Sequence, residues 1–534
     1  MLFIKNLTYY IGNRALYEDA SVNIKDGEKI GLIGLNGTGK STLLKIISGE
    51  KKIDSGKISV EKDAKIGFFN QDLLSYVTEE SIRNVAMRAF DDLLKLKEEI
   101  DKLLAEMEKE YSDDLLKKLF PMQEDFATKG GYDIERKTDI VLEGMGFKTE
   151  DLSRPLSEFS GGWRMRVMLS KLLLENPSVL MLDEPTNHLD IKSIQWLESY
   201  LKSYSGSVII VSHDRSFLDG MTNKTIEICN KKFTAYAGNY SFYEKEKEIR
   251  SELQDKAHKN QQDQIKQTKI FIEKFGAKAS KASQVQSRVK ALEKMEIIEK
   301  STSDASKIKF KFPVNQKSGK VIAEINNINK SFGALNLLKD ASVMINRGDK
   351  IALIGPNGQG KSTLLNIISE IIFSGESEDY KVNIGHNVIP SFFSQHQLDS
   401  LNVNNSVIEE LRFSAPQKEE PEIRKVAGMF LFTKDDVNKK IGVLSGGERS
   451  RVALGKVLLT DANFLILDEP TNHLDMASVA MLAQALKEYD GSFVVVSHDR
   501  HFLSLVANKI WYIENKKVEE FLGSYSDYTQ YNRQ

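Results

Sequence analysis

Two stretches of the chain combine closely spaced glycines with a lysine and hydroxyl side chains, a combination suited to holding phosphate groups. They are GLNGTGKST at 34–42 and GPNGQGKST at 355–363, and each follows an apolar run rich in β-branched residues. A strand would deliver the chain to a glycine-rich loop whose backbone N–H groups surround phosphates at a helix N-terminus. Glycine is expected there because a Cβ would hold the phosphates away. The two stretches therefore predict two phosphate-binding sites.

The side chains expected to hold the phosphates occupy the same positions in both loops. Lys40 and Lys361 would neutralise the β- and γ-phosphates, and the hydroxyls of Ser41 and Ser362 would bind Mg²⁺. The predicted nucleotide-binding residues are Gly34, Asn36, Gly37, Gly39, Lys40, Ser41 and Thr42 in the first loop, and Gly355, Asn357, Gly358, Gly360, Lys361, Ser362 and Thr363 in the second.

Two further apolar runs, VLMLDE at 179–184 and FLILDE at 464–469, have the pattern of buried strands and end in paired acids. Asp183 and Asp468 suit the Mg²⁺ shell, directly or through water. Glu184 and Glu469 follow at the next position, where a carboxylate could polarise an attacking water molecule. The alternative is that these acids only end a strand and cap a helix. It is disfavoured because the pair recurs with the phosphate loop in both places.

These motifs belong to an internal repeat. DEPTNHLD at 183–190 returns unchanged at 468–475, and SHDRSFL at 212–218 returns as SHDRHFL at 497–503, with the same offset. The phosphate loops are separated by a larger offset, so the first copy carries an insertion, located at roughly 84–128. That segment is rich in Leu, Lys and Glu, with apolar residues at helical spacing. It is predicted to be a helical hairpin that projects from the first domain.

The repeat also predicts the domain limits. A first α/β domain would occupy 1–243 and a second 316–534, because 534 residues are too many for one hydrophobic core. The connector at 244–315 is predicted to form two antiparallel helices of about 30 residues each, or about 45 Å. Its first part lacks Pro and Gly. The basic stretch KFGAKASKASQVQSR at 274–288 would then lie at the turn.

Composition excludes several classes of protein. The single cysteine, Cys229, rules out an intrachain disulfide and a cysteine-based zinc cluster. The N-terminus lacks the apolar core of a signal peptide. No uncharged apolar run reaches the length of about 18 residues that a transmembrane helix needs, so none is expected. The cytoplasm is the expected compartment. A net charge of −2 gives no global attraction to nucleic acid, so any polyanion must be met by a local patch.

FSGGWRMR at 159–166 and LSGGERSR at 444–451 resemble the signature motif of ATP-binding-cassette ATPases. In that superfamily two domains face head to tail, and each signature closes on the γ-phosphate held by the other domain. The resemblance implies ATP and Mg²⁺ as cofactors and two composite, hydrolysis-competent sites. It assigns the signature role to Ser160, Gly161, Gly162, Ser445, Gly446 and Gly447.

The same resemblance assigns further roles. Gln71 and Gln395 correspond to the glutamines that sense Mg²⁺ and the attacking water. His213 and His498 correspond to the switch histidines that contact the γ-phosphate, and they join Glu184 and Glu469 as candidate catalytic residues. Tyr10 and Phe332 are candidates for stacking on adenine, with plain packing as the alternative.

Four features together resemble the ABC-F family over essentially the whole chain. They are DEPTNHLD twice, SGGWRMR in the first copy, SHDR-x-FL twice, and the closing elements GNYSFY at 238–243 and GSYSDY at 523–528. The resemblance implies a cytoplasmic, ribosome-associated ATPase that acts in translation. It implies that ATP closes the cassettes, that hydrolysis releases them, and that the linker tip points toward the peptidyl-transferase centre and the P-site tRNA. It implies no membrane and no obligate protein subunit, so a monomer is expected.

The charge of the linker agrees with an RNA partner. The segment from Lys266 to Lys294 contains eight basic residues and only two acidic ones. Binding of RNA phosphates to such a protrusion would release counterions and so favour association. Phe275 could stack on a base. The candidate RNA contacts are Lys274, Lys278, Lys281, Arg288 and Lys290. The alternative is a solvated hairpin whose lysines only keep it soluble.

Three other functions stay open at this point. The first is protection of ribosomes from antibiotics by the same mechanism; the moderate length of the connector at 244–315 favours a general role in translation instead. The second is the motor of a transporter with a separate membrane subunit. The third is a DNA-maintenance ATPase, which the short hairpin and the single cysteine disfavour.

Overall fold

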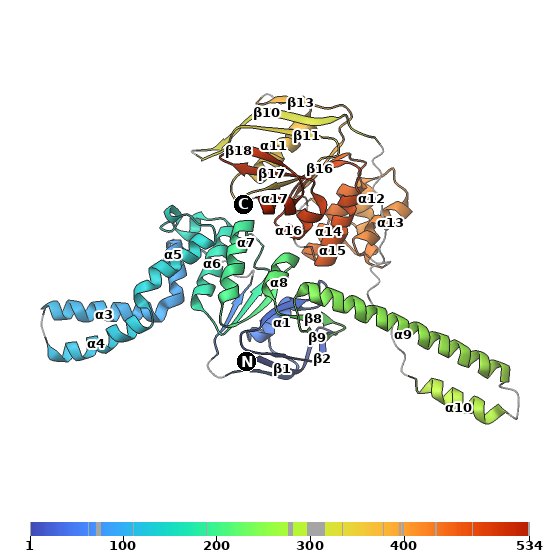
Figure 1. Cartoon of the computed structure of the whole chain (residues 1–534), viewed down its shortest axis with the longest axis horizontal. Helices are drawn as coiled ribbons and strands as arrows, with labels where there is room; N and C mark the ends of the chain where they lie inside the picture. Colours follow the sequence, from blue (N-terminus) through green and yellow to red (C-terminus); the bar gives the residue numbers. More distant parts are fainter. Residues whose placement is uncertain are drawn as a thin grey trace. The chain divides into compact units, whose positions relative to one another are not determined.

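The computed structural model describes residues 2–61, 64–70, 76–109, 112–187, 189–275, 281–295, 316–333, 335–377, 379–394, 397, 400–432, 435–472 and 474–531. The chain forms two compact units, which are described separately. One comprises Met1–Ala237 with Phe310–Gln534, and the other comprises Gly238–Lys309. The first unit holds both sequence repeats, and the second holds most of the predicted connector (Figure 1).

The first repeat contains two sheets. An antiparallel sheet of three strands has the order β2-β1-β4, and a mixed sheet of six strands has the order β5-β6-β7-β3-β8-β9. The strands are β1 (Leu2–Ile11), β2 (Arg14–Ile24), β3 (Lys29–Ile33), β4 (Ser55–Val60), β5 (Ile66–Phe69), β6 (Val179–Asp183), β7 (Ser207–Val211), β8 (Lys224–Cys229) and β9 (Lys232–Tyr236).

The central strands of the larger sheet are parallel and buried along their whole length. Every residue of β3 and of β7 is buried, as the continuous apolar runs of the sequence require for strands covered on both faces. Strands β6, β7 and β3 are neighbours in the same direction, so their carboxyl ends meet at one edge of the sheet. The phosphate loop, the acid pair and the switch histidine of the first repeat follow those three ends. Helices α1 (Lys40–Ile47), α6 (Gly161–Glu175), α7 (Ile191–Ser203) and α8 (Arg215–Met221) continue from that edge or pack beside it.

The second repeat has the same architecture. Its sheets have the orders β11-β10-β13 and β14-β15-β16-β12-β17-β18. The predicted fold of two tandem α/β domains is therefore confirmed. The strands are β10 (Val321–Phe332), β11 (Leu335–Asn346), β12 (Lys350–Ile354), β13 (Lys381–Ile384), β14 (Pro390–Phe393), β15 (Phe464–Asp468), β16 (Ser492–Val496), β17 (Lys509–Glu514) and β18 (Lys517–Leu522). The helices are α11 (Lys361–Ser374), α12 (Val407–Ser414), α13 (Glu420–Met429), α14 (Gly446–Leu459), α15 (Met476–Glu488), α16 (Arg500–Val506) and α17 (Tyr525–Tyr531).

The inserted segment of the first repeat is helical, as predicted. Helices α3 (Asp91–Lys109) and α4 (Asp113–Thr128) lie side by side (Figure 1). In the sequence they follow α2 (Ile82–Met87) and precede α5 (Ile134–Gly144). The pair shares a small apolar core with the start of α5, made of Ile100, Leu119, Phe126 and Ile134. Outside this core, Leu104 and Phe120 are large apolar side chains that stay exposed on the pair.

The linker consists of a long helix and a shorter one. Helix α9 spans Tyr240–Phe275, and α10 spans Ala282–Glu293 and packs against it (Figure 1). The guanidinium of Arg288 lies 3.9 Å from the centroid of the Phe271 ring, which joins the two helices by a cation–π contact. Helix α10 has 12 residues, so the predicted length of about 30 residues is wrong for the second helix. Lys278 and the rest of 276–280 lie outside the described residues.

Among the residues that the structure describes, no helix combines the length and the apolar content needed to cross a membrane.

We expect the core of the helical insertion to be cooperative and separate from the sheets. Phe126→Ala removes a buried ring, so it should cost about 3 kcal/mol and raise amide hydrogen exchange throughout α3 and α4. Phe120→Ala on the same helix is the matched control, because Phe120 is 64% exposed and should cost under about 0.5 kcal/mol. Equal exchange in the two variants would show that the hairpin does not depend on this core.

Candidate active sites

Each phosphate loop is a tight turn that leads directly into a helix. Gly39 and Gly360 precede α1 and α11 in the left-handed region, at φ 99° and 93°. A Cβ on Gly39 would come within 2.5 Å of the Tyr17 hydroxyl, which itself donates a hydrogen bond to the Gly39 carbonyl at 2.5 Å. Glycine is therefore required at this position by the backbone conformation and by Tyr17. Gly37 is also left-handed, but a Cβ there would point into open space.

The two loop lysines lie inside their loops. The Lys40 Nζ donates to the Gly34 carbonyl at 2.8 Å, and the Lys361 Nζ donates to the Gly355 carbonyl at 2.7 Å. Burial lowers the pKa of each lysine, and the nearby Glu184 and Glu469 respectively oppose that shift. Each loop thus holds a buried cation close to a buried carboxylate, and phosphate oxygens would be further partners for it.

A hydroxyl and a carboxylate converge beside each lysine, as the sequence predicts for Mg²⁺. The Ser362 Oγ donates to Asp468 Oδ1 at 3.3 Å. Burial raises the pKa of Asp183, and a hydrogen bond with Ser41 opposes the shift. Burial and Glu469 raise the pKa of Asp468 to about 6. These hard oxygen donors fit Mg²⁺, which in such sites takes most other ligands from phosphates and water.

The described residues contain no group of three His, Cys, Asp or Glu side chains able to hold a metal ion by themselves. The predicted Mg²⁺ sensors Gln71 and Gln395 lie outside the described residues.

The two candidate bases have an uncommon backbone conformation. Glu184 and Glu469 are left-handed, at φ 52° and 48°, although neither is glycine or asparagine. Each is held there by its backbone N–H, which donates to the carbonyl of Val211 at 2.8 Å or of Val496 at 2.9 Å on the neighbouring strand. Strain of this kind persists where the surroundings over-determine it, often at functional sites. No sequence signal indicated it.

The carboxyl groups of the candidate bases are buried. Burial raises the pKa of Glu184 to about 8, with Asp183 the next cause, and raises the pKa of Glu469 to about 7. Such carboxyls can accept a proton near neutral pH, as the polarisation of an attacking water requires. The structure thus gives both glutamates the environment of a general base.

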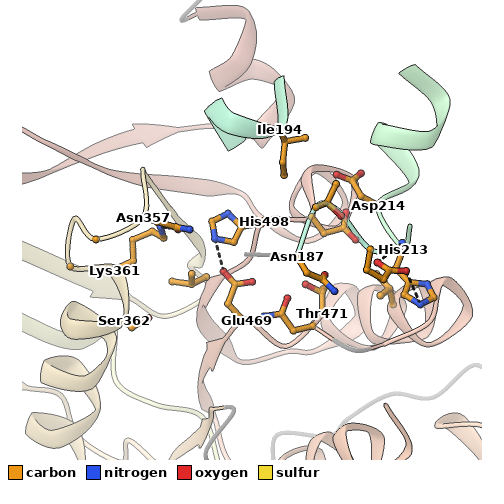
Figure 2. Close-up of a pocket in the computed structure, with 18 of the residues that line it drawn as sticks. Asn187, Ile194, His213, Asp214, Asn357, Lys361, Ser362, Glu469, Thr471 and His498 are labelled. Atoms are coloured by element: carbon orange, nitrogen blue, oxygen red, sulfur yellow. Dashed lines mark hydrogen bonds and ion pairs between the residues drawn. The ribbon is translucent and has the colours of Figure 1, made fainter. Parts of the chain in front are cut away.

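Each switch histidine lies against the base of its own copy. The His213 backbone N–H donates to Glu184 Oε2 at 3.2 Å, and the His213 Nε2 lies 3.4 Å from Glu184 Oε1. The His498 Nε2 lies 3.2 Å from Glu469 Oε1 (Figure 2). Burial, followed by Lys361, lowers the pKa of His498 to about 3. His498 is therefore neutral at physiological pH, and its contact with Glu469 is not an ion pair.

The candidate adenine-stacking residues do not occupy equivalent positions. When the two phosphate loops are aligned, Ser331 stands at the position of Tyr10, and Phe332 stands at the position of Ile11. Tyr10 and Phe332 are 45% and 57% exposed, near the ends of β1 and β10. Both rings are accessible, but the structure does not single them out as a matched pair.

The signature serines begin helices α6 and α14 and are exposed. Ser445 forms a capping box with Glu448, whose Oε2 accepts from the Ser445 hydroxyl at 2.7 Å. In the first copy Trp163 stands at the equivalent position, and its ring lies 4.3 Å from the Arg166 guanidinium. Among the described residues, neither serine makes a hydrogen bond with the phosphate loop of the other copy.

A contact between the two copies is made instead by Asp190, which the sequence analysis did not select. The Asn357 backbone N–H in the second phosphate loop donates to Asp190 Oδ2 at 3.4 Å. Asp190 also caps α7, since its Oδ1 accepts from the Ser193 N–H at 2.9 Å. Burial alone would raise the pKa of Asp190, but the bond from Ser193 and the charge of Arg166 lower it. An ionised aspartate of one copy therefore touches the phosphate loop of the other.

A cavity of about 400 Å³ lies at this contact and is lined by both copies (Figure 2). The second copy contributes its phosphate loop with Lys361 and Ser362, together with Glu469 and His498. The first copy contributes residues around its own acid pair and switch histidine, namely Glu184, Thr186, Asn187, Ile194, His213 and Asp214. Thr186, Asn187 and Asp214 were not predicted to be site residues, although all three lie within the repeated DEPTNHLD and SHDR-x-FL motifs.

Comparison with known proteins agrees with this geometry. The chain matches a family profile described as ABC transporter over residues 17–187 and 338–472, more than half of its length, and a second profile with that description over 226–312. It is 37% identical to ABC transporter F family member 5 of Arabidopsis thaliana, over 96% of this chain and 75% of the relative. The chain belongs to the F family of ATP-binding-cassette proteins.

Other relatives support the assignment. ABC transporter F family member 2 of Arabidopsis thaliana is 35% identical over 99% of this chain and 79% of its own length. The Bacillus subtilis protein YdiF is 37% identical over 99% of this chain and 82% of its own length. The solved structure of RNase-L Inhibitor has a TM-score of 0.61 at 15% identity, covers 99% of this chain and 92% of its own, and shows the shared fold. As a cassette protein of this family, the chain binds ATP and hydrolyses it.

The buried candidate bases should destabilise the folded protein at high pH. Because their folded pKa lies above the usual value for glutamate, the unfolded chain binds fewer protons, and stability falls as pH rises from about 4.5 toward 8. Replacing Glu469 by Gln removes this effect, so Glu469→Gln without nucleotide should gain stability on the order of 3 kcal/mol at pH 8.

Thermal unfolding at pH 5 and pH 8 measures this gain, which should shrink at the lower pH. Glu98→Gln, at an exposed position on α3, is the control and should gain nothing at either pH. A gain for Glu469→Gln that is the same at both pH values would contradict the assigned cause.

Proposed function

We propose that the chain is a cytoplasmic translation factor whose ATP-bound, closed form binds the ribosome and whose hydrolysis of ATP releases it. The observation that carries the ATP-driven part is the contact between Asp190 of one cassette and the phosphate loop of the other, at a cavity lined by both. ATP held there would bridge two cassettes and so favour the closed state over the open one.

The proposed roles of the site residues follow from their positions. Lys40 and Lys361 neutralise phosphate charge, and the two Ser–Asp pairs hold Mg²⁺ beside it. Glu184 and Glu469 polarise the attacking water from their left-handed, buried positions, and His213 and His498 orient them. The Mg²⁺ ion would supply charge neutralisation at the phosphates when bound.

Closure would complete each site with the signature of the opposite cassette. Ser160 and Ser445 are exposed at the start of their helices, where N–H groups and the helix dipole favour an anion. We assign Ser160 to the nucleotide on Lys361, because Asp190 of the same cassette already touches that loop. Ser445 would then serve the nucleotide on Lys40.

Two observations support the ribosome as partner. Solved structures with the same fold include one titled as a complex of an archaeal ribosome recycling factor, at a TM-score of 0.61, and a model of ribosome-bound archaeal Pelota and ABCE1, at 0.58. Within the linker, Lys274, Arg288 and Lys290 are exposed near the end of the hairpin. A basic tip of this kind suits RNA phosphates, with rRNA and the P-site tRNA as the proposed contacts.

The ribosome proposal is tested by trapping the closed state. In Glu184→Gln/Glu469→Gln, ATP should bind without being hydrolysed, because a glutamine amide cannot take a proton from the attacking water. We expect this variant to co-sediment with ribosomes in ATP at least about tenfold more than the wild type, and ADP should abolish the gain. Equal sedimentation in ATP and ADP would rule out ATP-driven ribosome binding.

The linker tip should act on translation and not on ATP hydrolysis. Lys278→Glu/Lys281→Glu should leave the basal ATPase rate within about twofold and weaken the effect on translation in a cell-free assay, because repulsion from RNA phosphates replaces attraction. Lys256→Glu/Lys259→Glu on α9 is the matched control, because the two lysines stand about 28 and about 24 Å along the helix from Phe275. If the two double variants have the same effect on translation, the tip serves only as a spacer.

A further inference from the structure

A buried ion-pair cluster joins the two cassettes beside the cavity. Arg500 begins α16 of the second cassette, and its Nη2 donates to Glu198 Oε1 on α7 of the first. The same Nη2 lies 3.9 Å from Asp214 Oδ2, at the start of α8. The side chains of Arg500, Glu198 and Asp214 are 15%, 14% and 7% exposed. The cluster is therefore largely shielded from solvent.

The charges of the cluster depend on one another. Asp214 faces Asp499 of the second cassette, and burial followed by Asp214 raises the pKa of Asp499 to about 7. Burial lowers the pKa of Arg500, but Asp214 and Glu198 raise it by more. Arg500 is thus a buried cation that offsets acids of the opposite cassette. Removing such a cation leaves uncompensated buried charge.

The cluster is built into the loops that carry both switch histidines. Asp214 directly follows His213, whose N–H donates to Glu184 Oε2 at 3.2 Å. Arg500 stands two residues after His498, which lies 3.2 Å from Glu469 Oε1. Asp214 and Asp499 also cap α8 and α16 by accepting from the N–H groups of Phe217 and Phe502. A continuous set of contacts therefore runs from one candidate base to the other.

The sequence makes this connection one-sided. When the two DEPTNHLD motifs are aligned, Arg215 corresponds to Arg500 and Asp214 to Asp499, but Glu198 corresponds to Ala483. Ala483 is buried on α15 and has no carboxylate to offer Arg215. The ion pair between Arg500 and Glu198 therefore cannot recur at the corresponding residues Arg215 and Ala483.

We propose that Arg500 is a positioning residue that couples the two ATP sites by tying the switch loop of the second cassette to Glu198 and Asp214 of the first. Any movement of the His498 loop on ATP binding moves a group that is hydrogen-bonded to the opposite cassette. ATP at one site then alters ATP affinity at the other. The inference concerns the ATPase itself and does not depend on a ribosome.

The test measures that coupling directly in the full-length Glu184→Gln/Glu469→Gln chain, which retains ATP. The affinity of the site at Lys40 for a fluorescent ATP analogue is measured twice, once with the second phosphate loop intact and once with Lys361→Ala. The ratio of the two affinities is the coupling factor. We expect a ratio of at least about fivefold. Adding Arg500→Met should reduce it below about twofold. Arg500→Lys, which keeps the charge, should retain more coupling than Arg500→Met.

Two further variants separate coupling from stability. Arg83→Met breaks a bidentate ion pair inside the first cassette, where the Arg83 Nε and Nη2 lie 2.8 and 2.9 Å from the Asp139 oxygens. It should leave the coupling factor within about twofold of the parent. Glu198→Gln removes the carboxylate that Arg500 binds, with little change of shape, and should also lower the coupling factor. It provides the test if Arg500→Met does not fold.

Three results would overturn the inference. They are an unchanged coupling factor in folded Arg500→Met and Glu198→Gln chains, an equal loss in Arg83→Met, and a parent ratio below about twofold. Because ribosomes are absent, failed ribosome binding by the trapped variant would refute the proposed function without touching this result.

Discussion

The parallel pairing of three strands in each cassette decides where every reacting group lies. In the first cassette β6, β7 and β3 run in the same direction as neighbours, and β15, β16 and β12 do so in the second. Groups at their carboxyl ends therefore meet at one edge, although they are far apart in the sequence. The same pairing holds Glu184 and Glu469 in the left-handed region, because each N–H donates to the adjacent strand.

This edge concentrates buried charge at a cost to stability. Lysine, aspartate and glutamate lie together there with little solvent, so the pKa of the lysines is lowered and that of the acids is raised. Buried ionisable groups are expensive unless they are paired. ATP phosphates and Mg²⁺ would supply the missing partners, so nucleotide binding would both stabilise the fold and assemble the reacting groups. The free-energy cost of the unpaired buried charges would be relieved when ATP binds, and this relief would add to the affinity of the site for ATP.

The two cassettes share a fold but differ at single positions that matter locally. Trp163 of the first cassette stacks on Arg166, whereas the equivalent Glu448 of the second forms a capping box with Ser445. Tyr17 donates a hydrogen bond to the first phosphate loop, whereas the equivalent residue of the second cassette is Leu338. Glu198 meets Arg500 where the mirrored residue is Ala483. These differences give the two ATP sites unequal surroundings. A tandem chain can keep such differences, whereas a symmetric homodimer cannot.

Much of the fold was determined by the sequence alone, because the signals are local. Glycine spacing, apolar strand runs and the repeated motifs predicted two α/β domains, the phosphate loops and the acid pairs. The helical insertion followed from the change of offset. Local signals failed for α10, which is shorter than its helical spacing predicted, because the end of a helix is a weaker local signal than its existence.

Only the tertiary structure decided which residues meet across the repeat. Asp190 touching Asn357, Arg500 reaching Glu198 and the strained backbone of both glutamates leave no local pattern, because each depends on groups far apart in the chain. The charge states of the site residues could not be predicted from the sequence either, because burial and neighbouring charges in the folded protein set each pKa. The sequence identified the reacting groups of each cassette, and the packing between the cassettes decided how one site is joined to the other.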